Sequence, residues 1–145
     1  MSDDDTHALA IAALRANVRH YAARDGLSFG ERPAADGGFH ALLAREDGDG
    51  ELYFAVSPPG STYLSLSLVL VVDETFFREN SKTILDVTSR YDVCVTLTGD
   101  EALGPGEVYL NLSLRVFLEG LNSRVFSLAL SNLAAAKDAL AESFP

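Results

Sequence analysis

Basic residues are scarce in this sequence, and they form no cluster. Lysine and arginine together number 11 against 21 aspartates and glutamates, the formal net charge is -10, and the lysines are Lys82 and Lys137. Nucleic acids and anionic membrane surfaces bind proteins largely through lysine and arginine. The composition therefore disfavours nucleic acid and membranes as partners. The acidic excess favours solubility, and it leaves open a preference for basic or hydrophobic partner proteins.

A long hydrophobic run is also missing. The longest apolar-rich stretch covers 64–72 and is interrupted by Ser65 and Ser67, whereas a membrane-spanning helix needs about 18 consecutive apolar residues. The chain begins with an acidic Met-Ser-Asp-Asp-Asp, unlike the basic start of a secretion signal. Cys94 is the single cysteine, so no disulfide can form within the chain. These features predict a cytoplasmic protein in a reducing environment.

No combination of residues in the sequence matches a catalytic or metal-binding motif. His7 and His20 are far apart on one expected helix, and His40 stands alone in an expected strand. Cys94 is flanked by valines, which indicates a buried or half-buried structural thiol rather than an activated nucleophile. We therefore expect no enzyme activity, no catalytic residue, no metal site and no cofactor.

The acidic segment 46–51 superficially resembles a calcium-binding loop. An EF-hand loop requires glycine at its sixth position and glutamate at its twelfth, and it lies between two helices. Counted from Asp47, these positions hold Leu52 and Pro58, and both flanks have strand-like sequences. The segment 47–50 is therefore interpreted as the turn of a β-hairpin.

Hydrophobic periodicity predicts an α+β fold in a single domain that covers 1–145, with 1–5 as a disordered acidic tail. Apolar residues at helical spacing indicate helices at 6–24, 74–91 and 123–143. Alternating apolar residues indicate strands at 39–46, 51–57, 62–72, 92–98 and 107–118, and the segment 27–38 is expected to be a loop. The order α-β-β-β-α-β-β-α predicts an antiparallel sheet of about five strands with the helices packed on one face.

The two longest expected strands have two different faces. Leucine and valine alternate from Leu64 to Val72 and from Val108 to Leu118, which assigns these positions to the core. The intervening positions carry almost no charge, although the solvated face of a sheet usually carries several. Uncharged polar residues mixed with tyrosine, valine and phenylalanine are typical of an interface with another protein or a second copy. The candidate interface residues are Tyr63, Ser65, Ser67, Tyr109, Asn111, Ser113, Arg115 and Phe117.

This uncharged face need not be an interface, and two alternatives stay open. Threonine and tyrosine favour strands in general, whatever the strands bind. Alternatively, another segment of the same chain covers the face.

Several segments of the second half of the chain resemble the YbjN-like family, whose fold is shared with type III secretion chaperones. They are the helical segment 84–91 (ILDVTSRY), the strands around 93–97 and 108–118, and the segment 121–133 (LNSRVFSLALSNL). The order of elements over the whole chain is also similar to that fold. The resemblance implies a chaperone-like, protein-binding role without a known active site. It also implies a homodimer that binds an extended segment of a cargo protein.

The expected function is a non-enzymatic protein-binding module, either chaperone-like or a regulatory adaptor, that forms a homodimer and binds a protein partner. The alternative is a small-molecule-sensing domain with a pocket between the sheet and the helices. A pocket lined by Tyr63, Tyr109 and neighbouring serines would favour that alternative. A structural subunit of a larger complex is a third hypothesis.

Overall fold

The computed structural model describes residues 2–45 and 51–144. In this part of the chain, three helices and six strands follow in the order α-β-β-β-β-α-β-β-α. The expected hairpin turn at 47–50 lies outside the described residues. The helices are α1 (Asp3–Arg24), α2 (Glu74–Ser89) and α3 (Ser123–Ser143). The strands are β1 (Leu27–Glu31), β2 (Phe39–Arg45), β3 (Leu52–Ser57), β4 (Tyr63–Asp73), β5 (Cys94–Thr98) and β6 (Glu107–Phe117).

The six strands form one antiparallel sheet in the order β1-β2-β3-β4-β6-β5. β4 and β6 are its longest strands, and they pair over their whole length from Tyr63↔Phe117 to Asp73↔Glu107. α2 connects β4 to β5, and the β5–β6 hairpin then places β6 beside β4. β5 and β1 form the two edges of the sheet. The predicted α+β class and antiparallel sheet are therefore confirmed.

The sheet contains one strand more than the sequence predicts. β1 lies in the segment expected to be a loop, and it pairs with β2 from Leu27↔Arg45 to Glu31↔Ala41. Leu27 is buried and Phe29 packs against the core. With only two apolar residues beside Gly30, the alternation is too short to identify a strand locally. Pairing with β2 stabilises the strand instead, and this long-range pairing is not visible in the local sequence.

Helix α1 begins earlier than expected. Ser2 is its N-cap, and the Ser2 hydroxyl accepts a hydrogen bond from the N–H of Asp5 at 3.2 Å. Asp3, Asp4 and Asp5 occupy the first turn, where the helix dipole stabilises carboxylates. Residues 2–5 therefore belong to a capped helix and not to a disordered tail.

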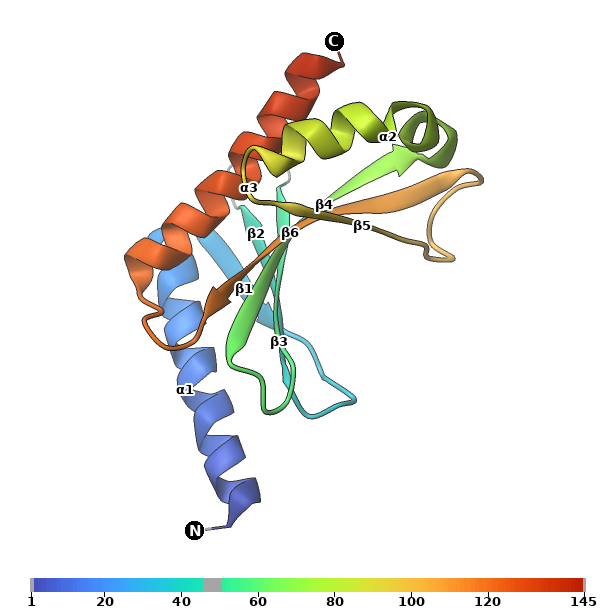
Figure 1. Ribbon diagram of the computed structural model, residues 1–145. Helices are drawn as coiled ribbons and strands as arrows, with labels where there is room; N and C mark the ends of the chain where they lie inside the picture. The colour runs from blue at the N-terminus through green and yellow to red at the C-terminus, as the bar shows by residue number, and fades with distance from the viewer. Residues whose placement is uncertain (1, 46–50, 145) are drawn as a thin grey trace.

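The three helices lie together on one side of the sheet, with α1 and α3 along its length and α2 across one end (Figure 1). α1 packs on β1 and β2, α3 packs on β4 and β6, and α2 packs on α3, β4 and β5. Caps fix the starts of α2 and α3, because the Asp73 and Asn122 side chains accept hydrogen bonds from the first-turn N–H groups. None of the described helices is long and apolar enough to cross a membrane.

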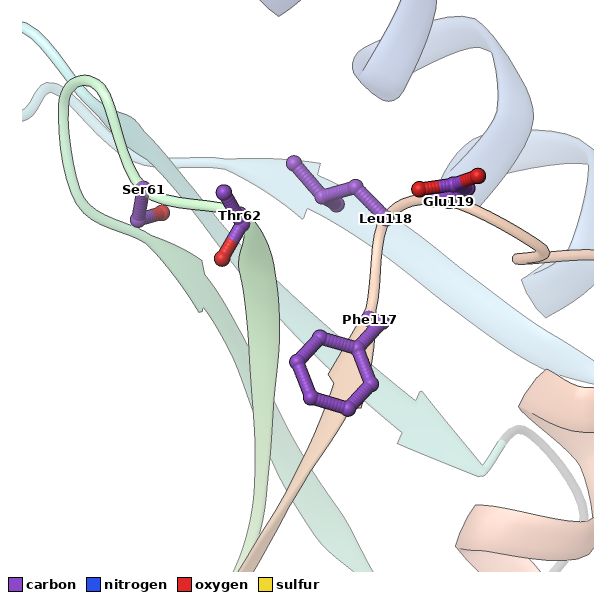
Figure 2. A pocket seen from close by; sticks show the side chains of 5 residues that line it. All are labelled: Ser61, Thr62, Phe117, Leu118 and Glu119. Carbon is purple, nitrogen blue, oxygen red and sulfur yellow. The ribbon is translucent and has the colours of Figure 1, made fainter.

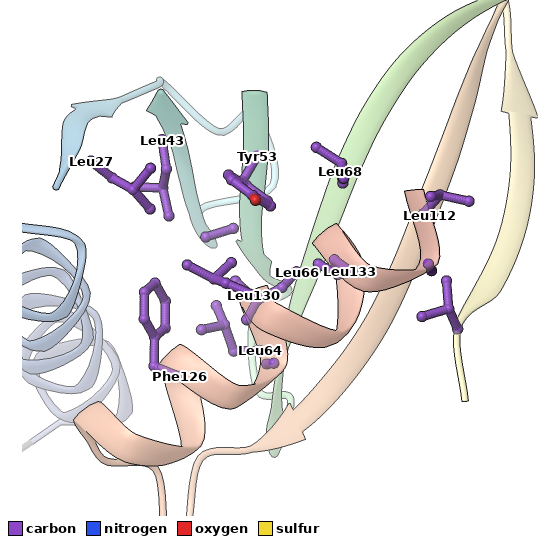
Figure 3. Close-up of a cluster of buried hydrophobic side chains, with 14 of the residues drawn as sticks. Leu27, Leu43, Tyr53, Leu64, Leu66, Leu68, Leu112, Phe126, Leu130 and Leu133 are labelled. Atoms are coloured by element: carbon purple, nitrogen blue, oxygen red, sulfur yellow. The ribbon is translucent and has the colours of Figure 1, made fainter. Parts of the chain in front are cut away.

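The core lies between the helices and the leucine side of the sheet. Figure 3 shows Phe126, Leu130 and Leu133 of α3 among leucines of the strands. Phe126 and Leu133 have no exposed surface, and Leu130 is 4% exposed. Leu64, Leu66, Leu68 and Leu112 are also fully buried, as the alternation of β4 and β6 predicts. Because all three helices lie on the leucine side, the opposite side of the same strands is free of helices.

Candidate functional site

The side of the sheet opposite the helices, here termed the open face, is covered by no part of residues 2–45 or 51–144. None of its side chains belongs to the buried core, whereas the buried core residues of β2, β3, β4 and β6 alternate with them along these strands. All eight candidate interface residues lie on this face, so the hypothesis of a covering segment is wrong for the described chain. The open face comprises His40, Leu42 and Ala44 of β2, Leu52, Phe54 and Val56 of β3, Tyr63, Ser65, Ser67, Val69 and Val71 of β4, Tyr109, Asn111, Ser113, Arg115 and Phe117 of β6, and Cys94, Thr96 and Thr98 of β5.

Charge is nearly absent along the β4–β6 ladder of the open face. Arg115 is its one charged residue until the end of the ladder, where Asp73 pairs with Glu107. Both of these carboxylates are engaged locally, Asp73 at the N-cap of α2 and Glu107 with an N–H of the turn before β6. Ser67 and Ser113 are direct partners in the middle of the ladder. The middle of the open face thus presents hydroxyl and apolar groups.

The opposite end of the ladder is apolar and open. Phe117 is 74% exposed, an unusual value for an aromatic side chain. Figure 2 shows Phe117 and Leu118 pointing to different sides of the chain, beside Ser61 and Thr62. Together with Glu119, these residues line a pocket of about 370 Å³. The pocket is wide enough to accept a side chain of a partner protein.

The two arginines associated with the open face both lie over aromatic rings. The Arg115 guanidinium is 4.3 Å from the centroid of Tyr63, and the Arg32 guanidinium, just after β1, is 5.9 Å from the centroid of Phe54. Within the described residues, neither guanidinium lies within 4.0 Å of a carboxylate, in contrast to Arg15, which pairs with Glu31. The open face therefore carries positive charge that is not neutralised locally, although the whole protein is acidic.

A hollow of about 440 Å³ indents the open face on the side of β2 and β3. Its apolar lining comes from Leu42, Leu52, Phe54 and Val69, and Tyr109 and Asn111 line its β6 side. Arg32 lies at one margin and Thr98, Gly99 and Asp100 at the other. The Asn111 amide donates a hydrogen bond to the Thr98 hydroxyl at 3.1 Å, which ties β6 to the edge strand. The sequence identified Tyr109 and Asn111 but missed the residues from β1, β2 and β3.

A separate pocket lies between the sheet and the helices, where the sensor hypothesis placed one. Its volume is about 290 Å³, and its lining is almost wholly apolar, with Lys137 as its charged residue. The rings of Phe76 and Phe144 in this lining meet edge to face, with their centroids 5.0 Å apart. Tyr63 and Tyr109 do not line it, because both point to the open face at opposite ends of the β4–β6 ladder. The lining that would favour the sensor hypothesis is therefore not found in this pocket.

The remaining reactive side chains are dispersed. Cys94 is exposed on edge strand β5, so the expectation of a buried or half-buried thiol is wrong. The ring nitrogen Nε2 of His7 lies 3.0 Å from the carbonyl of Gly37, and Nε2 of His40 lies 3.7 Å from Asp36. In the part of the chain that the structure describes, no three or more His, Cys, Asp or Glu side chains gather in a way that could hold a metal ion.

No protein-family model matches the chain, and no curated protein matches it. Among solved structures, the chain is similar to the crystal structure of an uncharacterized protein from Methanothermobacter thermautotrophicus, with a TM-score of 0.67 and 15% sequence identity. The match covers 88% of this chain and 96% of that chain. At this identity the likeness shows the fold alone, an α+β arrangement with an antiparallel sheet.

Proposed function

We propose that this protein is a non-enzymatic, cytoplasmic protein-binding module that binds protein through its open face, and that one occupant of this face is a second copy of the chain. The observation that carries the proposal is the β4–β6 ladder, which is uncovered and has Arg115 as its one charged residue between its ends. The resemblance to YbjN-like proteins and type III secretion chaperones supports a chaperone-like or adaptor role.

The size of the open face suits a stable interface. β4 and β6 contain 11 residues each, which corresponds to about 36 Å at roughly 3.3 Å per residue, and strands about 4.8 Å apart make the sheet about 25 Å wide. The face therefore offers on the order of 700–900 Å². Each partner in a standard interface buries about 800 Å², so the footprint of the face is of the size that such an interface needs.

The distribution of charge favours a second copy at this face. Each chain carries a formal net charge of -10, and two such chains repel each other at most orientations. The middle of the open face holds no carboxylate, so contact there keeps the acidic groups of the two copies apart. Exposed Phe117 and Val71 supply apolar surface whose burial favours association.

Molar mass in solution, measured by light scattering over a dilution series, tests this proposal. We expect the wild-type protein to have about twice the mass of the 15.5 kDa chain. The variant Ser67→Lys with Ser113→Glu places opposite charges on directly paired positions, so the charges stabilise the ladder while opposing burial of the face. This variant is expected to be monomeric with an unchanged circular dichroism spectrum.

The matched control places the same two charges on exposed helical positions, as Ser131→Lys with Thr83→Glu. We expect the control to assemble like the wild type. A wild-type monomer at all concentrations would overturn self-association. A dimer that the open-face variant leaves intact would place the interface elsewhere.

A further inference from the structure

The hollow on the open face has the size of a small-ligand site. Small-molecule sites are concave and mostly apolar, contain a few placed polar groups, and have volumes from about 300 Å³. The hollow measures about 440 Å³, and polar and apolar groups contribute about equally to its lining, with the phenol of Tyr109 and the amide of Asn111 among the polar ones. The hydrogen bond from Asn111 to Thr98 holds that amide in place, so its carbonyl oxygen has a defined position.

Arg32 determines the charge that this hollow prefers. Its guanidinium lines the hollow and lies over the ring of Phe54, and no carboxylate of the described residues is within ion-pair distance. A guanidinium stacked on a ring keeps its N–H groups free at the edge, where they match the two oxygens of a carboxylate. The backbone N–H of Arg32 donates to the carbonyl of His40 at 2.9 Å, which fixes the base of the side chain to β2.

We propose that the hollow binds a small organic carboxylate with an aromatic or branched apolar body. The carboxylate pairs with Arg32, and the apolar body lies on Leu42, Leu52 and Val69 beside the rings of Phe54 and Tyr109. Asp100 also lines the hollow, and one of its carboxylate oxygens accepts a hydrogen bond from the N–H of Ala102 at 3.0 Å.

This site goes beyond the proposed protein-binding function and does not depend on it. Tyr109 and Asn111 belong to both sites, whereas Arg32, Leu42 and Phe54 lie outside the β4–β6 ladder. A second copy on the open face would therefore compete with the ligand, so the titration is made at a protein concentration at which light scattering gives the mass of the single 15.5 kDa chain.

The test uses ¹⁵N-labelled protein titrated with 3-phenylpropionate, 4-methylpentanoate and two analogues of the first, the neutral 3-phenylpropanamide and the cationic 3-phenylpropylamine. For at least one of the acids we expect a Kd of about 1 mM or tighter, a range typical of ligands with about ten non-hydrogen atoms. The shifted backbone amides should be those near Arg32, Phe54, Tyr109 and Asn111. The amide and the amine should bind at least about tenfold more weakly than the acid.

The variant Arg32→Gln should weaken binding of the acid at least about tenfold. Arg115→Gln is its matched control, because Arg115 is also stacked on a ring of the open face but does not line the hollow. We expect the control to bind like the wild type. The proposal is overturned if neither acid shifts these amides at about 10 mM, if the amine binds as tightly as the acid, or if both arginine variants behave alike.

Discussion

The guanidinium of Arg115 lies 4.3 Å from the centroid of the Tyr63 ring, across the ladder between β6 and β4. Arg115 pairs with Ser65 and Tyr63 pairs with Phe117, so the two side chains are diagonal neighbours on the open face. An aromatic ring thus holds the guanidinium of Arg115, the one charged group between the ends of this ladder, where a salt bridge would need an acidic residue. The stacking orders the guanidinium without a carboxylate partner.

The Arg115–Tyr63 contact should stabilise the fold modestly. A cation–π contact at an exposed site contributes about 0.5–1 kcal/mol. We expect a double-mutant cycle of Tyr63→Leu and Arg115→Met, measured by urea unfolding, to give a coupling energy of about 0.5 kcal/mol. Tyr63→Phe should preserve the coupling, because its ring remains. Additive effects of the two substitutions would show that the contact contributes nothing.

The Ser127 hydroxyl joins α3 to the end of α1. It lies 2.7 and 2.9 Å from the two carboxylate oxygens of Asp25, the C-cap residue of α1. Removing a hydrogen bond to a charged group costs about 1.5–3 kcal/mol when the acceptor stays without a replacement. We expect Ser127→Ala to lower the free energy of unfolding by about 1.5 kcal/mol. Ser131→Ala, on the exposed surface of the same helix, should leave it unchanged, and equal effects would show that the bond to Asp25 adds no stability.

Protonation of Glu51 at acid pH should lower the free energy of unfolding. Its carboxylate accepts a hydrogen bond from the Tyr53 hydroxyl at 2.6 Å and lies 3.2 Å from Nε of Arg45. Burial raises the pKa of Glu51, but the hydrogen bonds from Tyr53 and Arg45 outweigh it and hold this pKa below its usual value of about 4.3. The resulting stabilisation is present above the unfolded-state pKa and is lost as the pH falls through the lower folded-state pKa.

Urea unfolding of Glu51→Gln and the wild type at several pH values measures this dependence. The wild type should exceed the variant in stability at pH 6, and the difference should shrink below about pH 4. Burial and the same hydrogen bond raise the pKa of Tyr53, so its hydroxyl stays protonated as the donor throughout. Tyr53→Phe removes that donor and should cost about 2 kcal/mol near neutral pH. A pH-independent difference between Glu51→Gln and the wild type would contradict this role of Glu51.

Two leucines of α3 offer a matched test of the core. Leu133 is fully buried against the sheet, whereas Leu128 is 56% exposed on the same helix. Leu133→Ala should lower the free energy of unfolding by about 2–5 kcal/mol, because it leaves a cavity. Leu128→Ala should change it by less than about 0.5 kcal/mol. Similar losses in chemical denaturation would mean that α3 does not pack with this face inward.

Alternation along β4 and β6 predicted both faces of these strands from the sequence, because the positions are set by local geometry with a period of two. β1 escaped prediction because it is short and its apolar residues, Leu27 and Phe29, are too few to show an alternation, so that its pairing with the next strand, β2, defines it. The hollow was missed because Arg32, Leu42 and Phe54 meet Tyr109 only where the strand order places them across the sheet. Cys94 shows the limit of local patterns most clearly, because its flanking valines suggest burial but β5 lies at an edge.

Because Cys94 is exposed on the open face, its rate of alkylation should depend on whether two copies meet through that face. Cys94 pairs with Ser113 on the open face and is exposed in the single chain. We expect iodoacetamide to alkylate Cys94 without denaturant in the monomeric Ser67→Lys, Ser113→Glu variant, as measured by intact-protein mass spectrometry. If two copies meet through their open faces, the wild-type thiol should react several-fold more slowly, and dilution should restore its rate. A thiol that reacts only after unfolding in the monomeric variant would contradict the exposed position, and a wild-type rate that is the same before and after dilution would place any dimer contact away from β5.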